Sequence, residues 1–126
     1  MEILLNRIIL FARDVNRLKL FYQEHFNFNL IEEIKNEWVV LKAGQIEIAF
    51  HKIGAAFDKN KETPFKVDSN TKLVFKIDGD LVFFHQNLIA KGVFLNDLKT
   101  FPGSNNLLCD GEDPEGNIFQ LSQKLI

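Results

Sequence analysis

The chain has few of the residues that mark secreted, membrane or nucleic-acid-binding proteins. Its single cysteine, Cys109, excludes an intrachain disulfide and favours a reducing compartment. Fifteen Lys and Arg against 17 Asp and Glu leave a net charge of -2, so no domain-wide positive field would attract nucleic acid. No apolar run approaches the roughly 20 residues of a membrane helix, and Met1-Glu2 leads directly into a strand-like segment. A cytoplasmic protein with neither nucleic-acid nor membrane partners is therefore expected.

Several catalytic signatures are also missing from the sequence: a phosphate-binding glycine loop, a dinucleotide fingerprint and a nucleophile elbow. Apolar residues make up 46% of the 126 residues and charged residues 25%, which is typical of a globular protein large enough to bury a core. Phenylalanine is abundant, with 13 copies against one Tyr and one Trp. This bias indicates a core, and a possible cavity, lined with flat apolar rings.

The first half of the chain alternates between strand and helix patterns. Residues 3–12 predict a strand, and Asp14 is a suitable N-cap for a helix that Asn27 can end in the left-handed conformation. The apolar face of this helix recurs at three- and four-residue spacing, at Val15, Leu18, Phe21, Tyr22, His25 and Phe26. Three short strands are predicted to follow, over 28–34, 37–41 and 45–51.

The second half repeats this order. Residues 71–77 predict a strand, and Asp80 caps a helix that closes at Gly92. Further strands are predicted over 93–95, 106–110 and 117–123. One domain over 1–126 is expected, with a βαβββ module at about 1–52, a polar connection at about 53–70 and a second module at about 71–126. Two copies of one unit imply a pseudo-twofold arrangement with a cleft between the sheets.

A tight turn is predicted at Asp113-Pro114-Glu115-Gly116-Asn117. Pro114 presets φ at the second place of the turn, and Gly116 can adopt the positive φ that closes it. The neighbouring carboxylates of this acidic hairpin, Asp110, Glu112, Asp113 and Glu115, are interpreted as a run that keeps the turn solvated. Cys109 has no base beside it in sequence and is predicted to be a buried, inert thiol.

These features together resemble the glyoxalase, bleomycin-resistance and extradiol-dioxygenase superfamily, which has the vicinal-oxygen-chelate fold. The resemblance covers nearly the whole chain and is carried by Phe11-Ala12-Arg13-Asp14-Val15 leading into Leu18 and Phe21-Tyr22, by Gln45-Ile46-Glu47-Ile48, and by the Asp113–Asn117 turn. One departure is Phe26-Asn27-Phe28, where the family usually has Leu-Gly-Phe. The resemblance implies an α+β fold of two tandem βαβββ modules, whose curled mixed sheets surround a concave cleft with the helices outside.

In metal-using members of this family, four side chains from the first and fourth strands of the modules bind a divalent ion. The corresponding places in this chain are Arg7, Glu47, Lys72 and Gln120. Only Glu47 and Gln120 are of a ligand type, and Arg has no lone pair to offer a metal. The metal site implied by the resemblance is therefore predicted to be lost, and no cofactor is expected.

The cations at two of these places have two interpretations. Arg7 could form a bidentate pair with Glu47 and have only a structural role, or a cation left over after pairing could hold an acidic or carbonyl-bearing ligand. Strand alternation adds Phe11 and His51 to the same face, and Trp38 if its strand is in the matching register. The predicted ligand-binding residues are Arg7, Phe11, Trp38, Glu47, His51, Lys72 and Gln120.

The sequence thus predicts a metal-free protein that binds a small organic molecule, closer to the drug-binding resistance branch than to the lyases or dioxygenases. The resemblance also implies a homodimer. Two alternatives stay open. The chain could be a divergent metal-dependent lyase, isomerase or dioxygenase that uses displaced ligands such as Glu47 with His51. It could also be a protein whose pocket has closed, leaving a structural or partner-binding role.

Overall fold

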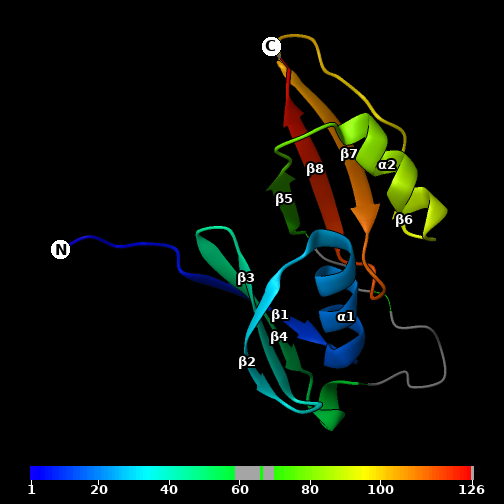
Figure 1. The fold of residues 1–126 in the computed structure, drawn as a ribbon. Coiled ribbons are helices and arrows are strands. Elements are labelled where there is room, and N and C mark those ends of the chain that lie inside the picture. The colour runs from blue at the N-terminus through cyan, green and yellow to red at the C-terminus, as the bar shows by residue number, and fades with distance from the viewer. Residues whose placement is uncertain (59–65, 67–69, 126) are drawn as a thin grey trace. The chain divides into compact units, whose positions relative to one another are not determined.

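Two βαβββ units make up the chain in a computed structural model, which describes residues 1–58, 66 and 70–125 (Figure 1). The units are Met1–Phe65 and Lys66–Ile126. Much of the predicted connection at 53–70, namely residues 59–65 and 67–69, lies outside the described residues. The predicted α+β fold with two modules of one helix and four strands is confirmed.

Unit 1 is a four-stranded sheet with one long helix. Its elements are β1 (Arg7–Ala12), α1 (Val15–Phe26), β2 (Asn29–Ile34), β3 (Trp38–Ala43) and β4 (Ile46–Lys52), followed by a short 3-10 helix at Ala55–Phe57. The strand order is β1-β4-β3-β2, with β1 parallel to β4 and the other neighbours antiparallel. The first strand is shorter than predicted, because residues 1–6 continue past the start of β4 and only Asn6 reaches it, through its carbonyl oxygen and the Glu47 amide.

Unit 2 repeats this topology. Its elements are β5 (Lys72–Lys76), α2 (Leu81–Ala90), β6 (Phe94–Leu95), β7 (Asn106–Glu112) and β8 (Ile118–Lys124). The strand order is β5-β8-β7-β6, again with one parallel pair, β5 and β8. Neither α1 nor α2 is long and apolar enough to cross a membrane, and the described residues contain no other helix that is.

The two helices begin and end where the sequence predicts. The Asp14 carboxylate accepts a hydrogen bond from the Arg17 amide at 3.1 Å, and Asn27 ends α1 with φ of 57°. Asp80 caps α2 in the same way, by accepting from the Phe83 amide at 3.2 Å. These side chains satisfy donors that a helix start leaves unpaired.

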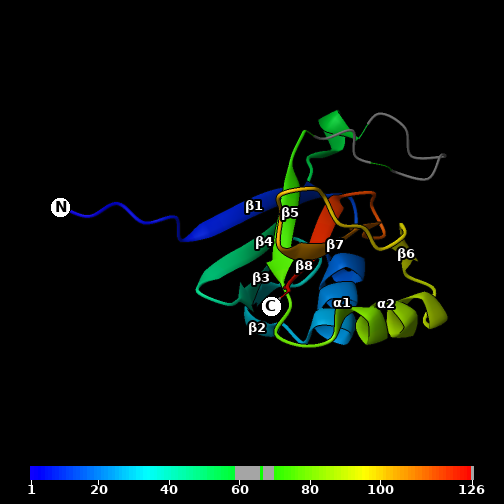
Figure 2. The ribbon, with the colours of Figure 1, turned by 90° about the horizontal axis from the view of Figure 1, so that it is seen from above.

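The core of unit 1 lies between α1 and one face of its sheet. Helix α1 contacts β3 and β4 (Figure 2). Its buried residues Leu18 and Tyr22 meet that face, where the Tyr22 and Phe50 rings stack with centroids 5.4 Å apart. Phe50 and its neighbours at alternate positions therefore point toward α1, and the intervening residues of β1, β3 and β4 point to the opposite face.

Close packing in unit 2 explains one glycine. Gly111 lies on β7 opposite Phe119, and a Cβ atom at this position would come within 2.5 Å of the Leu95 side chain and 2.6 Å of the Phe119 ring. Real Cβ atoms do not approach other heavy atoms this closely. Any other residue at 111 would therefore push β6 or the Phe119 ring away.

The predicted turn between β7 and β8 is present, but its expected solvation is wrong. Gly116 has φ of 80° and donates its amide hydrogen to the Asp113 carbonyl. Asp113 and Glu115 are only 5% and 3% exposed. The Asp113 carboxylate can be buried because it accepts hydrogen bonds from the amides of Glu115 and Asn117 and from the Asn117 side chain.

Candidate functional site

Five of the seven predicted site residues lie on one face of the unit 1 sheet, opposite α1. The register pairs Arg7 with Glu47, and it places Phe11 opposite His51, which in turn lies opposite Trp38. Because side chains alternate along a strand, all five point to the same side. We call this surface the unit 1 face. The sequence left the register of the Trp38 strand open, and the structure gives the matching register, with Trp38 opposite His51.

The charged end of the unit 1 face is an ion pair. The Nε and Nη2 atoms of Arg7 lie 2.9 and 2.7 Å from Oε1 of Glu47, and Glu32 is 3.9 Å from the same guanidinium. Both close contacts go to one carboxylate oxygen, so the geometry is not the two-oxygen fork that a bidentate pair would give. The guanidinium carbon also lies 5.6 Å from the centroid of the Trp38 ring, within cation–π range.

The other end of the unit 1 face is a cluster of three rings, which we call the aromatic trio: Phe11, Trp38 and His51. The His51 ring has its centroid 5.6 Å from that of Phe11 and 5.7 Å from that of Trp38. Phe11 is 61% exposed, and His51 is exposed as well. Exposed aromatic side chains that cluster on a sheet face make this end of the unit 1 face a candidate binding surface.

The two remaining predicted residues lie in unit 2, where they meet a carboxylate that the sequence prediction had assigned to a solvated hairpin. Lys72 Nζ is 2.9 Å from Oδ2 of Asp110, and Gln120 donates its amide to Oδ1 at 3.0 Å. Lys99 lies 3.6 Å from Oδ2. Antiparallel β7 and β8 place position 110 opposite position 120, a register that strand alternation in the sequence does not give.

Asp110 is held in its charged form. Burial alone would raise its pKa, but hydrogen bonds from Lys72 and Gln120, together with the charges of Lys72 and Lys99, outweigh burial and lower the pKa below its ordinary value. Neighbouring Cys109 shows the opposite behaviour, since burial and the Asp110 charge raise its pKa to about 11 against the opposing charge of Lys99. Its buried thiol is protonated at neutral pH and is not a nucleophile.

The donor set does not suit a divalent metal. Among these residues each unit offers one carboxylate, and each carboxylate already contacts a cation. Glu47 contacts Arg7 in unit 1, and Asp110 contacts Lys72 in unit 2. Protonated Arg and Lys have no lone pair for a metal and repel it. Across residues 1–58, 66 and 70–125, no three His, Cys, Asp or Glu side chains gather closely enough to hold an ion. These residues therefore do not fit the metal implied by the resemblance.

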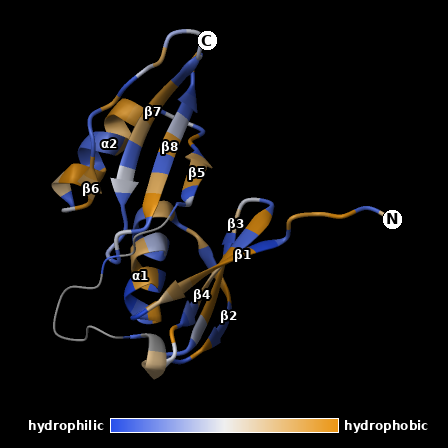
Figure 3. Cartoon of the chain, turned by 180° about the vertical axis from the view of Figure 1, so that it is seen from behind, coloured by the Kyte–Doolittle hydropathy of each residue, from blue (hydrophilic) through white to orange (hydrophobic). Residues whose placement is uncertain are grey.

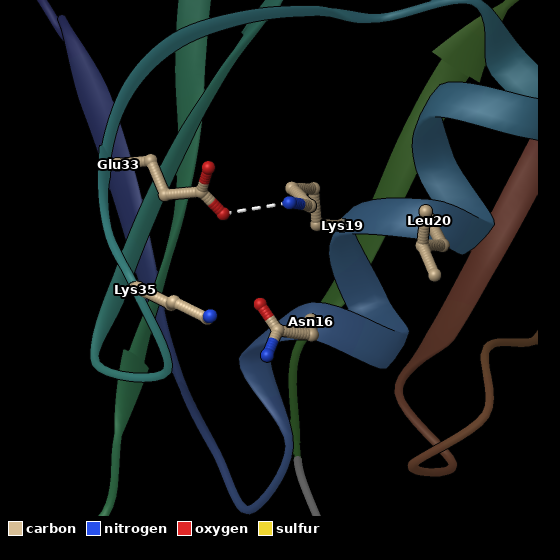
Figure 4. A pocket seen from close by; sticks show the side chains of 5 residues that line it. All are labelled: Asn16, Lys19, Leu20, Glu33 and Lys35. Carbon is tan, nitrogen blue, oxygen red and sulfur yellow. Dashed lines mark hydrogen bonds and ion pairs between the residues drawn. The ribbon is translucent and has the colours of Figure 1, made fainter.

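Two hollows on the surface of unit 1 lie away from the unit 1 face. A pocket of about 470 Å³ between α1 and β2 is lined by Asn16, Lys19, Leu20, Glu33 and Lys35 (Figure 4). Lys19 and Glu33 close part of it with an ion pair of 2.6 Å. A second hollow of about 350 Å³ surrounds the start of α1, where Arg13 is paired with Asp58 at 2.8 Å. Neither hollow contains a predicted site residue, and no sequence motif pointed to them.

Comparison with known proteins depends on structure alone, because no protein-family model and no curated protein matches the sequence. Lactoylglutathione lyase from Agrobacterium tumefaciens aligns with a TM-score of 0.74 and 15% identity, over 95% of this chain and 92% of that chain. The fosfomycin resistance protein FosX from Listeria monocytogenes aligns with a TM-score of 0.75 and 16% identity, over 100% and 97%. An integron cassette protein from Vibrio cholerae gives 0.71 and 20%, over 98% and 97%.

At such identities the likeness concerns the fold, and in these three alignments it extends over 92% or more of each chain. The neighbours include glyoxalase-like and fosfomycin-resistance proteins, and their shared fold is the one that the sequence resemblance implied. The protein therefore has the same fold as these proteins, the vicinal-oxygen-chelate fold.

Proposed function

We propose that the protein binds a small, flat organic molecule on its unit 1 face, without a divalent metal. The aromatic trio is the observation that carries this proposal. The His51 ring lies between the other two in a cross-strand row, 5.6 Å from the Phe11 ring and 5.7 Å from the Trp38 ring, and Phe11 is exposed although it is large and apolar. A flat ligand would cover these rings and gain both apolar contact and ring stacking.

The charges favour a neutral ligand over an anionic one. The sequence suggested that a leftover cation could hold an acidic group, but Arg7 contacts Glu47 and Lys72 contacts Asp110. A ligand carboxylate would have to compete with these partners. His51 supplies an imidazole at the centre of the trio, which can donate or accept a hydrogen bond according to its tautomer. We therefore propose a ligand with a flat apolar ring and one hydrogen-bonding group.

Sequestration is the activity that agrees with this set of side chains. Binding requires only a complementary surface, whereas the family's lyase and dioxygenase chemistry requires a metal that Arg7 and Lys72 oppose. The alternative enzyme would pair Glu47 with His51, but these residues occupy different cross-strand rows, one opposite Arg7 and the other opposite Phe11. We therefore propose that the protein resembles the drug-binding branch in function, and we propose a cytoplasmic location, as the lone cysteine favours.

Native mass spectrometry of the purified protein tests the proposal most directly, because it reports retained ligand and metal together. We expect protein without a stoichiometric transition metal, whether or not an organic molecule is retained. Stoichiometric nickel, zinc, iron or manganese that survives dialysis would contradict the metal-free proposal and favour the enzyme.

Binding can be followed by the fluorescence of Trp38, since the chain has one tryptophan and it belongs to the aromatic trio. Flat aromatic fragments should quench or shift its emission in a saturable way. Phe11→Ala should weaken binding by about tenfold or more, because truncating a central aromatic contact commonly costs more than 1 kcal/mol. Phe83→Ala is the matched control, because Phe83 is equally exposed but lies on α2 in unit 2. Equal losses in both variants would contradict the proposed surface.

The structural role of Arg7 can be separated from ligand binding. Arg7→Met leaves the half-buried Glu47 carboxylate without its main partner, so the free energy of unfolding should fall by about 1–3 kcal/mol. Adding Glu47→Gln should recover most of that loss, because the lone charge disappears. Urea unfolding measures both variants. A ligand affinity that falls more for Arg7→Met than for Phe11→Ala would show that the guanidinium itself holds the ligand.

A further inference from the structure

The centre of the unit 1 face is buried, whereas residues at its margins are exposed. Val40 and Ala49 lie opposite each other on the two central strands, β3 and β4, and both are 0% exposed. We call these two residues the central pair. The next cross-strand row, which contains the aromatic trio, ends at Phe11 on β1 and Ile34 on β2, and both of these are 61% exposed. Burial on this face is therefore local to its centre.

One side chain from each outer strand of the sheet extends over that centre. Arg7 is on β1 and Glu32 is on β2, the first and last strands of the order β1-β4-β3-β2. Glu32 pairs with Val40 and so points to the same side of the sheet. Three strand spacings separate β1 from β2, roughly 14 Å across a flat sheet. The Nη2 atom of Arg7 nevertheless lies 3.9 Å from Oε2 of Glu32, so the two side chains approach each other above β4 and β3.

The Arg7 guanidinium also reaches the rows on either side of the central pair. It contacts Glu47 at 2.7 Å, and its Cζ atom lies 5.6 Å from the centroid of the Trp38 ring. Glu47 belongs to the row before the central pair, and Trp38 belongs to the row after it. A guanidinium with neighbours in both rows and on the far outer strand therefore lies over the central pair. We call the chain of contacts Glu47–Arg7–Glu32 the strap.

The two ends of the strap differ in strength. At one end the side chains of Arg7 and Glu47 are 30% and 18% exposed, and a hydrogen bond from Nε at 2.9 Å adds to the ion pair. At the other end the contact is long, and the side chain of Glu32 is 54% exposed. Exposed ion pairs contribute little to stability and are weakened by salt. The strap is therefore anchored at Glu47 and easily released at Glu32.

The central pair forms an apolar floor beside the aromatic trio. Figure 3 shows hydrophobic residues among hydrophilic ones on the strands of unit 1. Exposing Val40 and Ala49 to water is unfavourable, so the strap stays closed while nothing else covers them. Successive rows on one face of a sheet are about 7 Å apart, so a single ring fits on the trio, while fused rings extend over the floor. Only the wider ligand has to displace the strap.

We propose that the strap is a gate on the unit 1 face, closed in the free protein, which releases Glu32 to admit a ligand wider than the row of the aromatic trio. What passes the gate rests on the proposed function, whereas the closed strap is a property of the unliganded chain. Arg7 then acts as a specificity-determining residue, because its position decides whether a ligand reaches the central pair. Salt and the charge of Glu32 control the opening.

Acrylamide quenching of Trp38 fluorescence tests the strap without any ligand. Acrylamide is neutral, and the only tryptophan of the chain lies beside the Arg7 guanidinium. Glu32→Gln removes the weak end of the strap, so the open population should rise about two- to fivefold, as expected for an exposed ion pair, and quenching should rise with it. In about 1 M NaCl the wild type should approach the variant, whose own quenching should not change.

Glu33→Gln is the matched control for this experiment. Glu33 is the next residue of β2 and loses the same charge, but it is paired with Lys19 of α1, on the other side of the sheet. Its quenching should equal that of the wild type. Equal quenching in the wild type and in both variants would overturn the strap.

Fragment binding, measured by isothermal titration calorimetry, tests the gate. Glu32→Gln should tighten the binding of naphthol about two- to fivefold and leave that of phenol unchanged, because only the fused rings must displace the strap. Glu33→Gln should change neither affinity. Naphthol binding that Phe11→Ala weakens but Glu32→Gln leaves unchanged would overturn the gate and retain the proposed surface. Absence of binding for both fragments in every variant would contradict the proposed function, and the gate with it, while the quenching result would still decide the strap.

Discussion

Asp110 shows how much one side chain can organise in this protein. Its carboxylate joins three strands, because it lies on β7 and accepts from Lys72 on β5 and Gln120 on β8. The residue types at positions 72 and 120 could be read from the sequence, but their partner could not be chosen until the register of β7 was known. Side chains two strands apart meet only when both pairings are fixed, and a single sequence does not fix them.

Removing this carboxylate should make stability less dependent on pH. The folded pKa of Asp110 lies below its unfolded value of about 3.9, so its contribution is present above that pH and is lost as the pH falls through the folded pKa. At pH 7, Asp110→Asn should lower the free energy of unfolding by roughly 0.5–2 kcal/mol. Urea unfolding should be measured from pH 7 to pH 2.5. The difference in the free energy of unfolding between Asp110→Asn and wild type should become smaller in the acid range. Asp97→Asn, at an exposed position, is the control, and a difference that stays constant with pH would contradict the assignment.

At the scale of the elements, the caps and turns were the most predictable features. Asp14, Asn27 and Asp80 all act as the sequence indicated, because capping depends on residues close together in the chain. The start of β1 was not predictable in this way. Alternation continues from residue 3, but a strand also needs a neighbour, and β4 ends its contact with β1 near Asn6.

The cap of α1 offers a test at this scale. Asp14→Ala should lower the free energy of unfolding by about 1 kcal/mol, because the Arg17 amide loses its acceptor. Asp14→Asn should retain most of the stability, since an amide oxygen can accept the same bond. Thermal or urea unfolding distinguishes them. An Asn variant as unstable as the Ala variant would show that the charge of Asp14, and not its hydrogen bond, is what stabilises the helix.

At the scale of the whole molecule, two cores support the two units. Leu18 on α1 of unit 1 and Leu121 on β8 of unit 2 are both fully buried. The repeat was visible in the sequence because each unit carries its own caps, alternation and turns. The aromatic trio was predicted residue by residue, but its geometry depended on the pairing of Trp38 with His51.

A cavity made in the core of one unit should destabilise mainly that unit. Leu18→Ala and Leu121→Ala should each lower the free energy of unfolding by about 2–5 kcal/mol, the usual range for buried leucines. Hydrogen exchange followed by mass spectrometry should show the greater loss of amide protection in unit 1 for the first variant and in unit 2 for the second. Equal loss across both units from either variant would show that the chain unfolds as one cooperative body.

The buried turn between β7 and β8 has a consequence for the ageing of the protein. The Asn117 side chain donates to both oxygens of the Asp113 carboxylate. Spontaneous deamidation would turn that donor into a second carboxylate and set two negative charges against each other in a site with little water. Samples stored for long periods at alkaline pH should therefore lose their native fold from this hairpin outward, and an intact mass gain at Asn117 would mark the damaged fraction.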